Sequence, residues 1–455
     1  MANRPTRRSF LKAGAAVAGG VASAMVVPRR VLGGPRQIPP SEKVNVAGVG
    51  IGGMGAGNLG NLASQNIVAL CDVDPDNYAA GTIKRYPKAK VYVDYREMLD
   101  KQKDIDGCVV ATPDHTHAVI SMAAMKAGKH VYCQKPLTHD VYESRMLAKT
   151  AKECKVATQM GIQGHSMDGI RQAAEWVWGG VIGDVREVDA WCDLTYYPWG
   201  HAGWSSQWSD RPKETPPVPP GMNWDLWIGP APMRPYHRAY HPATWRCFWD
   251  FGCGMMGDRG AHTLDPVVFA LKLGPPTGID ATSCGNTPEV HPLSNIVTFK
   301  FPARTQGVPG FPPLVLTWYE GTRPPRPEDL EDGRGWPGEG GALIKGSKGT
   351  IMFGVYGNSP RIIPEAKMKA ARLPPPSIPR VRESHEMDWV RACKTGEPAG
   401  ADFSYSGPLT ETCLLGNIAK RVDARILWDA ANLKITNLPD ANRYVRTEYR
   451  KGWEL

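Results

Sequence analysis

The chain has 455 residues, of which 42% are hydrophobic and 22% are charged. These shares are typical of a globular protein with a sizeable core and exclude a largely disordered chain, while the length suits two domains. The formal net charge of +9 does not indicate nucleic-acid binding, because seven of these charges lie in the first forty residues and the rest of the chain carries only +2.

Residues 1–40 form a distinct leader with seven basic residues and no acidic one. Residues 6–12 read TRRSFLK, which resembles a twin-arginine export signal, and an apolar stretch follows over residues 13–27. That stretch is shorter than the ~20 residues of a transmembrane helix, so no integral membrane span is predicted. We expect a signal and linker here, and a periplasmic or otherwise exported protein; an uncleaved anchor or a chance basic tail is the alternative.

A glycine-rich turn follows the first predicted strand, residues 44–49. The spacing G-x-G-x-x-G occurs there in two registers, starting at Gly48 or at Gly50, and the later register is preferred because it leaves a longer strand. Its residues are Gly50, Gly52, Met54 and Gly55. Glycines allow a tight turn and a close approach of backbone N–H groups to a pyrophosphate at the start of the next helix, here predicted over residues 57–65.

Asp72 ends the second predicted strand, residues 67–71, and lies 22 positions after Gly50. A carboxylate at about this spacing accepts the ribose hydroxyls of a dinucleotide, and it would repel the 2′-phosphate of NADP. The sequence therefore favours NAD as cofactor. NADP stays open, because Arg85 could compensate that phosphate if it lay near it.

Strand and helix patterns alternate through the first part of the chain, which predicts a doubly wound parallel sheet over residues 41–165. The predicted strands are residues 90–93, 107–111, 130–133 and 156–160, and the predicted helices are residues 95–101 and 119–127. Ligands bind at the carboxyl ends of such strands. The polar residues that follow these ends are Thr112, Asp114, His115, His117, Gln134, Lys135, Gln163 and His165. For His115 and His117, caps within a loop are the alternative to cofactor binding.

Residues 166–455 are predicted to contain the strands of a second sheet. Alternating patterns place strands at residues 185–191, 296–301, 314–319 and 341–353, and helices at residues 383–394 and 410–422. Ten of the fifteen tryptophans lie between Trp176 and Trp249. Aromatic rings suit the C–H faces of sugars, so Trp191, His201 and Arg246 are the predicted substrate contacts; packing of a Pro-rich loop or of a subunit interface is the alternative.

Five stretches together resemble the Gfo/Idh/MocA family of oxidoreductases. They are the glycine turn, ALCDVD around Asp72, ATPDHTHA from Ala111, GKHVYCQKPL from Gly128 and GDRGAHTLD from Gly257. The resemblance runs from about Lys43 to the C-terminus. It implies a Rossmann domain and, over residues 166–455, a second α/β domain with a large open, mainly antiparallel sheet that also serves homo-oligomer formation. It further implies a catalytic set of Lys135, Asp258 and His262. The family's usual glutamate before the lysine is replaced here by Gln134.

These three residues suit the oxidation of a secondary alcohol, which needs a base for the hydroxyl proton while hydride leaves from the same carbon. His262 is the expected base, Asp258 orients it or holds a neighbouring hydroxyl, and Lys135 stabilises the developing alkoxide. If residues 258–271 are helical, Asp258 and His262 share one face. The alternatives are that Asp258 only caps a helix, that His262 is a core histidine and that Lys135 is a surface lysine. No metal site is expected, because no close His or Cys cluster accompanies Asp265.

We therefore expect an exported enzyme that acts on a sugar, glycoside or polyol. Outside the cytoplasm there is no obvious pool of fresh cofactor, so the cofactor should stay tightly bound and be restored within each cycle. Two further readings stay open. One is an NAD-dependent glycosidase that works by transient oxidation and elimination, and the other is a catalytically inactive sugar-binding protein.

Overall fold

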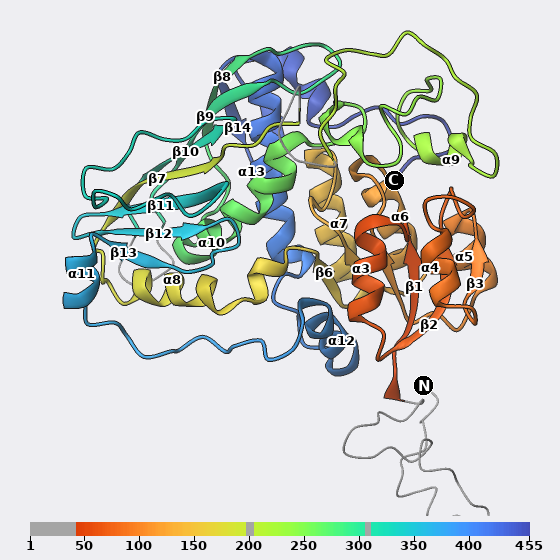
Figure 1. Cartoon of the computed structure of the whole chain (residues 1–455), viewed down its shortest axis with the longest axis horizontal. Helices are drawn as coiled ribbons and strands as arrows, with labels where there is room; N and C mark the ends of the chain where they lie inside the picture. Colours follow the sequence, from red (N-terminus) through yellow and green to blue (C-terminus); the bar gives the residue numbers. More distant parts are fainter. Residues whose placement is uncertain (1–41, 197–203, 305–310) are drawn as a thin grey trace, which may run out of the picture. The chain divides into compact units, whose positions relative to one another are not determined.

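Six parallel strands form the first sheet, in the order β3-β2-β1-β4-β5-β6. The computed structural model describes residues 42–196, 204–304 and 311–455, so the predicted leader lies outside the described residues. The strands are β1 (Asn45–Val49), β2 (Asn66–Cys71), β3 (Lys90–Tyr92), β4 (Gly107–Val110), β5 (His130–Cys133) and β6 (Thr158–Met160). The strand order reverses between β1 and β4, which opens a crevice at the carboxyl ends of the strands (Figure 1).

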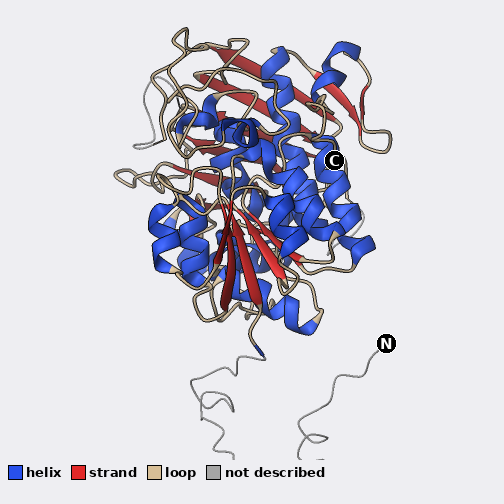
Figure 2. Cartoon of the chain, turned by 90° about the vertical axis from the view of Figure 1, so that its right-hand side faces the viewer, coloured by secondary structure: helices blue, strands red, loops and turns tan. Residues whose placement is uncertain are grey.

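Helices cover both faces of this sheet, as Figure 2 shows. They are α3 (Gly53–Asn61), α4 (Ala80–Arg85), α5 (Tyr95–Lys101), α6 (Asp114–Lys126) and α7 (Val141–Cys154). Two of them begin earlier than predicted, α3 at Gly53 rather than residue 57 and α6 at Asp114 rather than residue 119. The reason is that glycines and polar residues fill their first turns and interrupt the hydrophobic pattern.

Nine strands form the second sheet, in the order β13-β12-β11-β7-β10-β9-β8-β14-β15. All neighbours pair antiparallel except β7 and β10, so the predicted fold class is confirmed. The predicted strand 341–353 is a hairpin of two strands. The strands are β7 (Val185–Cys192), β8 (Gly278–Cys284), β9 (Ser294–Phe301), β10 (Leu314–Glu320), β11 (Gly340–Gly346), β12 (Thr350–Gly354), β13 (Arg361–Ile363), β14 (Ile426–Asp429) and β15 (Lys434–Ile435).

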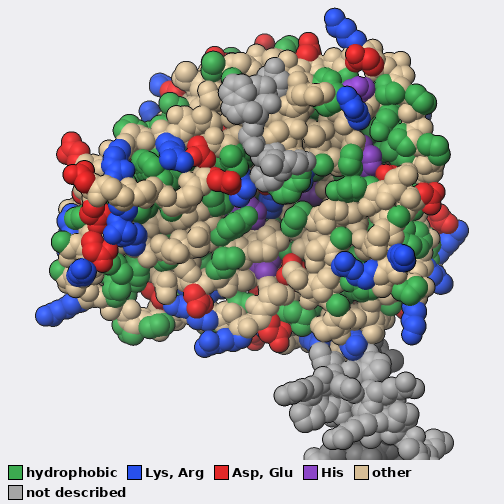
Figure 3. Space-filling model, in the orientation of Figure 1, with side chains coloured by type: hydrophobic (Ala, Val, Ile, Leu, Met, Phe, Trp, Pro, Cys, Tyr) green, Lys and Arg blue, Asp and Glu red, His purple; other side chains and the backbone are tan. Residues whose placement is uncertain are grey.

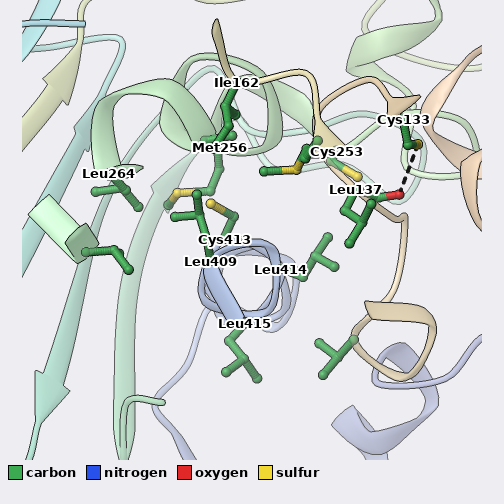
Figure 4. Packing of buried hydrophobic residues seen from close by; sticks show 14 of the residues in the cluster. Cys133, Leu137, Ile162, Cys253, Met256, Leu264, Leu409, Cys413, Leu414 and Leu415 are labelled. Atoms are coloured by element: carbon green, nitrogen blue, oxygen red, sulfur yellow. Dashed lines mark hydrogen bonds between the residues drawn. The ribbon is translucent and has the colours of Figure 1, made fainter. Parts of the chain in front are cut away.

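The second half of the chain also holds several helices, of which α13 lies between the two sheets (Figure 1). They are α8 (Asp168–Trp178), α9 (Trp224–Ile228), α10 (Ala261–Leu271), α11 (Glu365–Ala370), α12 (His385–Thr395) and α13 (Phe403–Val422). Figure 4 shows Leu409, Cys413 and Leu414 of α13 packed beneath Cys133 and Cys253, which come from different halves of the chain. The two halves therefore share one hydrophobic core.

Helix α12 packs against one face of the first sheet, although its residues come much later in the sequence. Trp389 is fully buried and packs with Val109 and Tyr132 of that sheet. The ring nitrogen of Trp389 also donates to the carbonyl oxygen of Ala157 at 3.4 Å. Residues beyond 380 thus provide part of the cover of the nucleotide-binding half.

Candidate active site

A cavity of about 290 Å³ lies at the carboxyl ends of the parallel strands. Figure 3 shows histidine and basic side chains around a hollow on this face of the molecule. The lining includes nearly every predicted site residue, from both halves of the chain: Gly50, Gly52, Met54, Asp72, Thr112, Asp114, His117, Lys135, Gln163, Arg246, Asp258 and His262. The structure thus brings the predicted cofactor and catalytic residues together.

The glycine turn begins at Gly50, because Gly48 lies within strand β1. Gly50 has φ +74°, and a Cβ atom there would lie 2.7 Å from the backbone nitrogen of Thr112. Gly55 does not line the cavity, but a Cβ atom on it would lie 1.9 Å from the carbonyl oxygen of Gly50. Only glycine lets helix α3 approach the turn this closely. The bare backbone at the start of α3 fits the pyrophosphate of a dinucleotide.

Asp72 lies at the carboxyl end of β2, beside this turn. Its Oδ2 accepts the backbone N–H of Ile51 at 2.8 Å, and its Oδ1 accepts that of Asp74 at 3.0 Å. Burial raises the pKa of Asp72 above its usual value. Each oxygen keeps a lone pair for a ribose hydroxyl, so the residue fits NAD. Arg85 is not among the residues that line the cavity, and its guanidinium lies 3.7 Å from where a Cβ of Gly60 would be.

Three side chains form a polar chain at the other end of the cavity. The Nζ of Lys135 contacts Oδ1 of Asp258, and the hydroxyl of Tyr196 donates to Oδ2 of the same carboxylate. Lys135 follows strand β5, and Asp258 lies in a π-helical turn, Met256–Gly260, that leads into α10. Burial lowers the pKa of Lys135 to about 7 and raises the pKa of Asp258 to about 7. Both shifts bring the pair close to exchanging a proton at neutral pH.

His262 lies one helical turn after Asp258, buried at 5% exposure. Its Nδ1 has no hydrogen-bond partner among the described residues, and its ring meets that of Tyr356 edge-on with centroids 4.7 Å apart. Burial, with the nearby charge of Lys135, lowers the pKa of His262 well below 6.5. The imidazole is therefore neutral at pH 7.

His115 and His117 lie in the first turn of α6, not in a loop as expected. The two ring nitrogens of His117 each lie 2.8 Å from a carbonyl oxygen, that of Pro136 and that of Thr112. These contacts tie the segment after β4 to the segment after β5 and occupy the nitrogens that were predicted to reach the cofactor. Both ring nitrogens of His115 also face carbonyl oxygens, those of Phe251 and Trp227.

The aromatic segment divides between the cavity and the core. Arg246 lines the cavity together with Trp204 and Trp245. The prediction that Trp191 contacts the substrate was wrong. Its side chain is fully buried on the outer face of the second sheet, against Leu343, and it does not line the cavity. Side chains alternate between the faces of a strand, so a residue one position along would have pointed the other way. His201 lies outside the described residues.

Several cavity residues or their partners were missed in the sequence, and four of them illustrate why. The hydroxyl of Tyr196 donates to Asp258, and the ring of Tyr356 packs on that of His262. Arg259 and Trp453 line the wall of the cavity. Their positions depend on contacts across the fold, and only Arg259, inside the GDRGAH motif, carried a local signal. Among the described residues no three His, Cys, Asp or Glu side chains are grouped as a metal site. No described helix has the length and apolarity to cross a membrane.

Comparisons with known proteins match both halves of the chain. Residues 44–162 match the oxidoreductase family with an NAD-binding Rossmann fold (GFO_IDH_MocA), and residues 191–283 match the C-terminal alpha/beta domain of that oxidoreductase family. A solved structure of the WlbA dehydrogenase from Bordetella pertussis, in complex with NADH and UDP-GlcNAcA, aligns with a TM-score of 0.59 at 16% identity. It covers 85% of this chain and 99% of that one, which shows a shared fold.

Two curated relatives match over shorter stretches. A glycosyl hydrolase family 109 protein from Shewanella pealeana is 30% identical over 168 residues, which is 32% of this chain and 37% of that protein. Inositol 2-dehydrogenase from Salmonella typhimurium is 30% identical over 145 residues, 31% of this chain and 43% of that protein. The matched stretches thus span less than half the length of either relative.

The glycine turn, the parallel sheet and the antiparallel second sheet define a two-domain protein with a dinucleotide-binding fold in its first half. Both halves match models of the Gfo/Idh/MocA family, and residues 44–162 match its NAD-binding Rossmann domain.

Proposed function

We propose that this chain is an exported NAD-dependent oxidoreductase that acts on a hydroxyl group of a sugar, glycoside or polyol. The observation that carries the proposal is the contact of Lys135 with Asp258, and of Asp258 with Tyr196, in the same cavity as the glycine turn and His262. An ammonium group, a carboxylate and a neutral imidazole are the groups that alcohol oxidation needs.

Bound NAD would supply the hydride acceptor. The chain's own residues handle the proton and the charge. Neutral His262 accepts the hydroxyl proton, and the ammonium group of Lys135 stabilises the negative charge that develops on the substrate oxygen. Asp258 holds the ammonium group in place and is itself held by Tyr196. The buried site excludes water, which strengthens each of these interactions.

The aromatic segment and the C-terminal tail support a tightly bound cofactor. The backbone N–H of Asn223 donates to the carbonyl oxygen of Val73 at 2.8 Å, just after strand β2. The Nε2 of His241 lies 3.0 Å from Oδ2 of Asp74 in the same loop, and Trp453 lines the cavity near Tyr95. These contacts cross the nucleotide end of the cavity, so cofactor exchange would require them to open.

A glycosidase that works by transient oxidation is the second candidate, and the observation that favours it is the match to the family 109 relative. In that route a ketone next to the leaving group acidifies a C–H bond, and elimination replaces direct displacement. The retained cofactor would serve either route. An inactive sugar-binding protein is disfavoured, since the glycine turn, Lys135 and His262 are all in place.

Export and oligomer formation are part of the same proposal. The twin-arginine pattern supports a periplasmic or otherwise exported location, because that route carries folded proteins. The outer face of the second sheet supports a homo-oligomer, because Ile296 and Val315, on neighbouring strands, expose 42% and 38% of their surface there. Size-exclusion chromatography with light scattering would test the oligomer.

The function is tested by purifying the protein, measuring the nicotinamide that survives dialysis, and offering free sugars, polyols and aryl glycosides. Ketone accumulation supports the oxidoreductase, whereas aglycone release without net cofactor reduction supports the glycosidase. We expect His262→Ala to lose turnover on every active substrate and His130→Gln, which changes a histidine outside the cavity, to keep it. Unchanged turnover in His262→Ala would overturn the catalytic assignment.

A further inference from the structure

Arg246 is a cation in the cavity wall without an acidic partner. Its Nη1 donates to the carbonyl oxygen of Ala243 at 2.9 Å, and no carboxylate lies at ion-pair distance within residues 42–196, 204–304 and 311–455. The guanidinium carbon lies 4.5 Å from the ring centroid of Trp204 and 4.3 Å from that of Trp245. The two rings fix the position of the guanidinium group and do not neutralise its charge.

The neighbouring cations of the cavity have acidic partners. Lys135 contacts Asp258, and the Nη2 of Arg259 lies 3.3 Å from Oε2 of Glu339. The other acid at this end, Asp114, raises the pKa of Arg246 by its charge, but it forms no ion pair with Arg246 within the described residues, and its Oδ2 accepts the backbone N–H of Cys253 at 2.9 Å. Of these three cations, Arg246 is therefore the one that could form a new ion pair with an anionic ligand.

Burial makes an unpaired guanidinium costly, and here it lowers the pKa of Arg246. The positive charge of Arg246 also lowers the pKa of Lys135, and both side chains line the same cavity. An anion held by Arg246 would therefore share the cavity with the oxygen that Lys135 stabilises.

We propose that Arg246 binds a carboxylate of the substrate, so that the preferred substrates are acidic sugars, their glycosides or acidic polyols. This inference rests on the proposed function, because it assumes that the reacting hydroxyl lies at Lys135. A guanidinium group presents parallel N–H donors that match a carboxylate, and a desolvated pair of this kind is stronger than a hydrogen bond to a neutral hydroxyl.

The pyrophosphate of the cofactor offers the same anionic oxygen chemistry as a substrate carboxylate. The charge of Arg246 acts on Lys135, which favours the substrate, but it also acts on Tyr78, which packs against Gly52 of the glycine turn. The two sources are separated by measuring cofactor content and substrate selectivity on the same variant.

The kinetic arm compares matched pairs that differ only at one carbon, glucose with glucuronate and methyl glucoside with methyl glucuronide. We expect the wild type to prefer the acidic member in kcat/KM, and Arg246→Gln to raise KM for it by about tenfold to hundredfold while the neutral member changes little. Arg246→Lys should keep part of the preference. Arg238→Gln is the control, because Arg238 lies over Trp208 in the same segment but is exposed and outside the cavity.

The binding arm measures bound nicotinamide after dialysis and titrates glucuronate and glucose calorimetrically into the cofactor-loaded protein. We expect Arg246→Gln to keep its nicotinamide and to lose glucuronate binding. Loss of nicotinamide with unchanged selectivity would assign the guanidinium to the pyrophosphate and overturn the inference. Turnover without a preference for the acidic member would overturn it and leave the proposed function standing. Glucuronate binding that depends on Arg246, with no turnover of any sugar, would instead support the anion site and contradict the proposed redox function.

Discussion

The two ends of the cavity are built in different ways. The nucleotide end consists largely of backbone atoms from consecutive strands and helices, with Gly50 and Gly55 allowing the turn, helix α3 and the segment after β4 to pack closely. The reacting end consists of side chains from distant segments, where Lys135, Asp258 and Tyr196 meet at one carboxylate. Changes at the first end should therefore affect retention of the cofactor, and changes at the second should affect chemistry with the cofactor still bound.

The largest expected effect is that of Lys135→Met, which removes the charge that stabilises the reacting oxygen. We expect kcat to fall by about 10³ while bound nicotinamide is unchanged. Single-turnover kinetics and cofactor content measure the two quantities. Lys129→Met is the control, since Lys129 lies before the start of β5 and donates to the carbonyl oxygen of Ile105 at 2.7 Å. A variant that lost its cofactor in step with its activity would break the separation between the two ends.

At the nucleotide end, Gly55→Ala places a Cβ atom against the carbonyl oxygen of Gly50. Forcing the turn apart should lower the free energy of unfolding by about 1–3 kcal/mol and release much of the bound nicotinamide. Gly57→Ala, in the same helix, meets nothing within 4 Å and should be neutral or slightly stabilising. Thermal unfolding and nicotinamide assays compare the two variants, and equal cofactor content in both would contradict the close approach.

Asp72→Asn removes the carboxylate that faces the ribose but keeps the shape of the side chain. The loss of charged hydrogen bonds should weaken NAD retention by about tenfold to hundredfold and lessen the discrimination against NADP. Exchange of labelled NAD and NADP into the protein measures both. Asp76→Asn, exposed a few residues later, serves as the control. Faster exchange of NADP than of NAD in the unmodified protein would be the opposite of what we expect.

The smallest effect concerns pH at the reacting end. Because the pKa of Lys135 is lowered to about 7, its ammonium form is lost as pH rises through that value. Alcohol oxidation should therefore decline above about pH 7, by up to tenfold per pH unit, while neutral His262 remains competent. This decline of the rate above about pH 7 should disappear in the Lys135→Arg variant, because the guanidinium group stays charged. A pH profile that rises through 7 would instead identify Lys135 or its partner Asp258, whose pKa is also about 7, as a proton acceptor.

The sequence predicted the nucleotide end far better than the reacting end. The glycine spacing and Asp72 are separated by one β-α-β unit, so local patterns placed them correctly, and strand β5 matched its predicted bounds. Tyr196 and Tyr356 could not be found in this way, because each meets its partner across the fold. Trp191 was misplaced because alternation along a strand shows two faces but does not show which face meets the cavity.

The burial of Trp389 against the first sheet has a consequence for how the protein is made. A ribosome adds ~5–20 residues per second, so the early strands wait on the order of ten seconds or more before helix α12 emerges to cover them. Until then the first half of the chain exposes the hydrophobic residues that Trp389 covers in the finished fold, and a fragment ending near residue 165 would be prone to aggregate. Newly made chains should thus need chaperone protection until translation is almost finished.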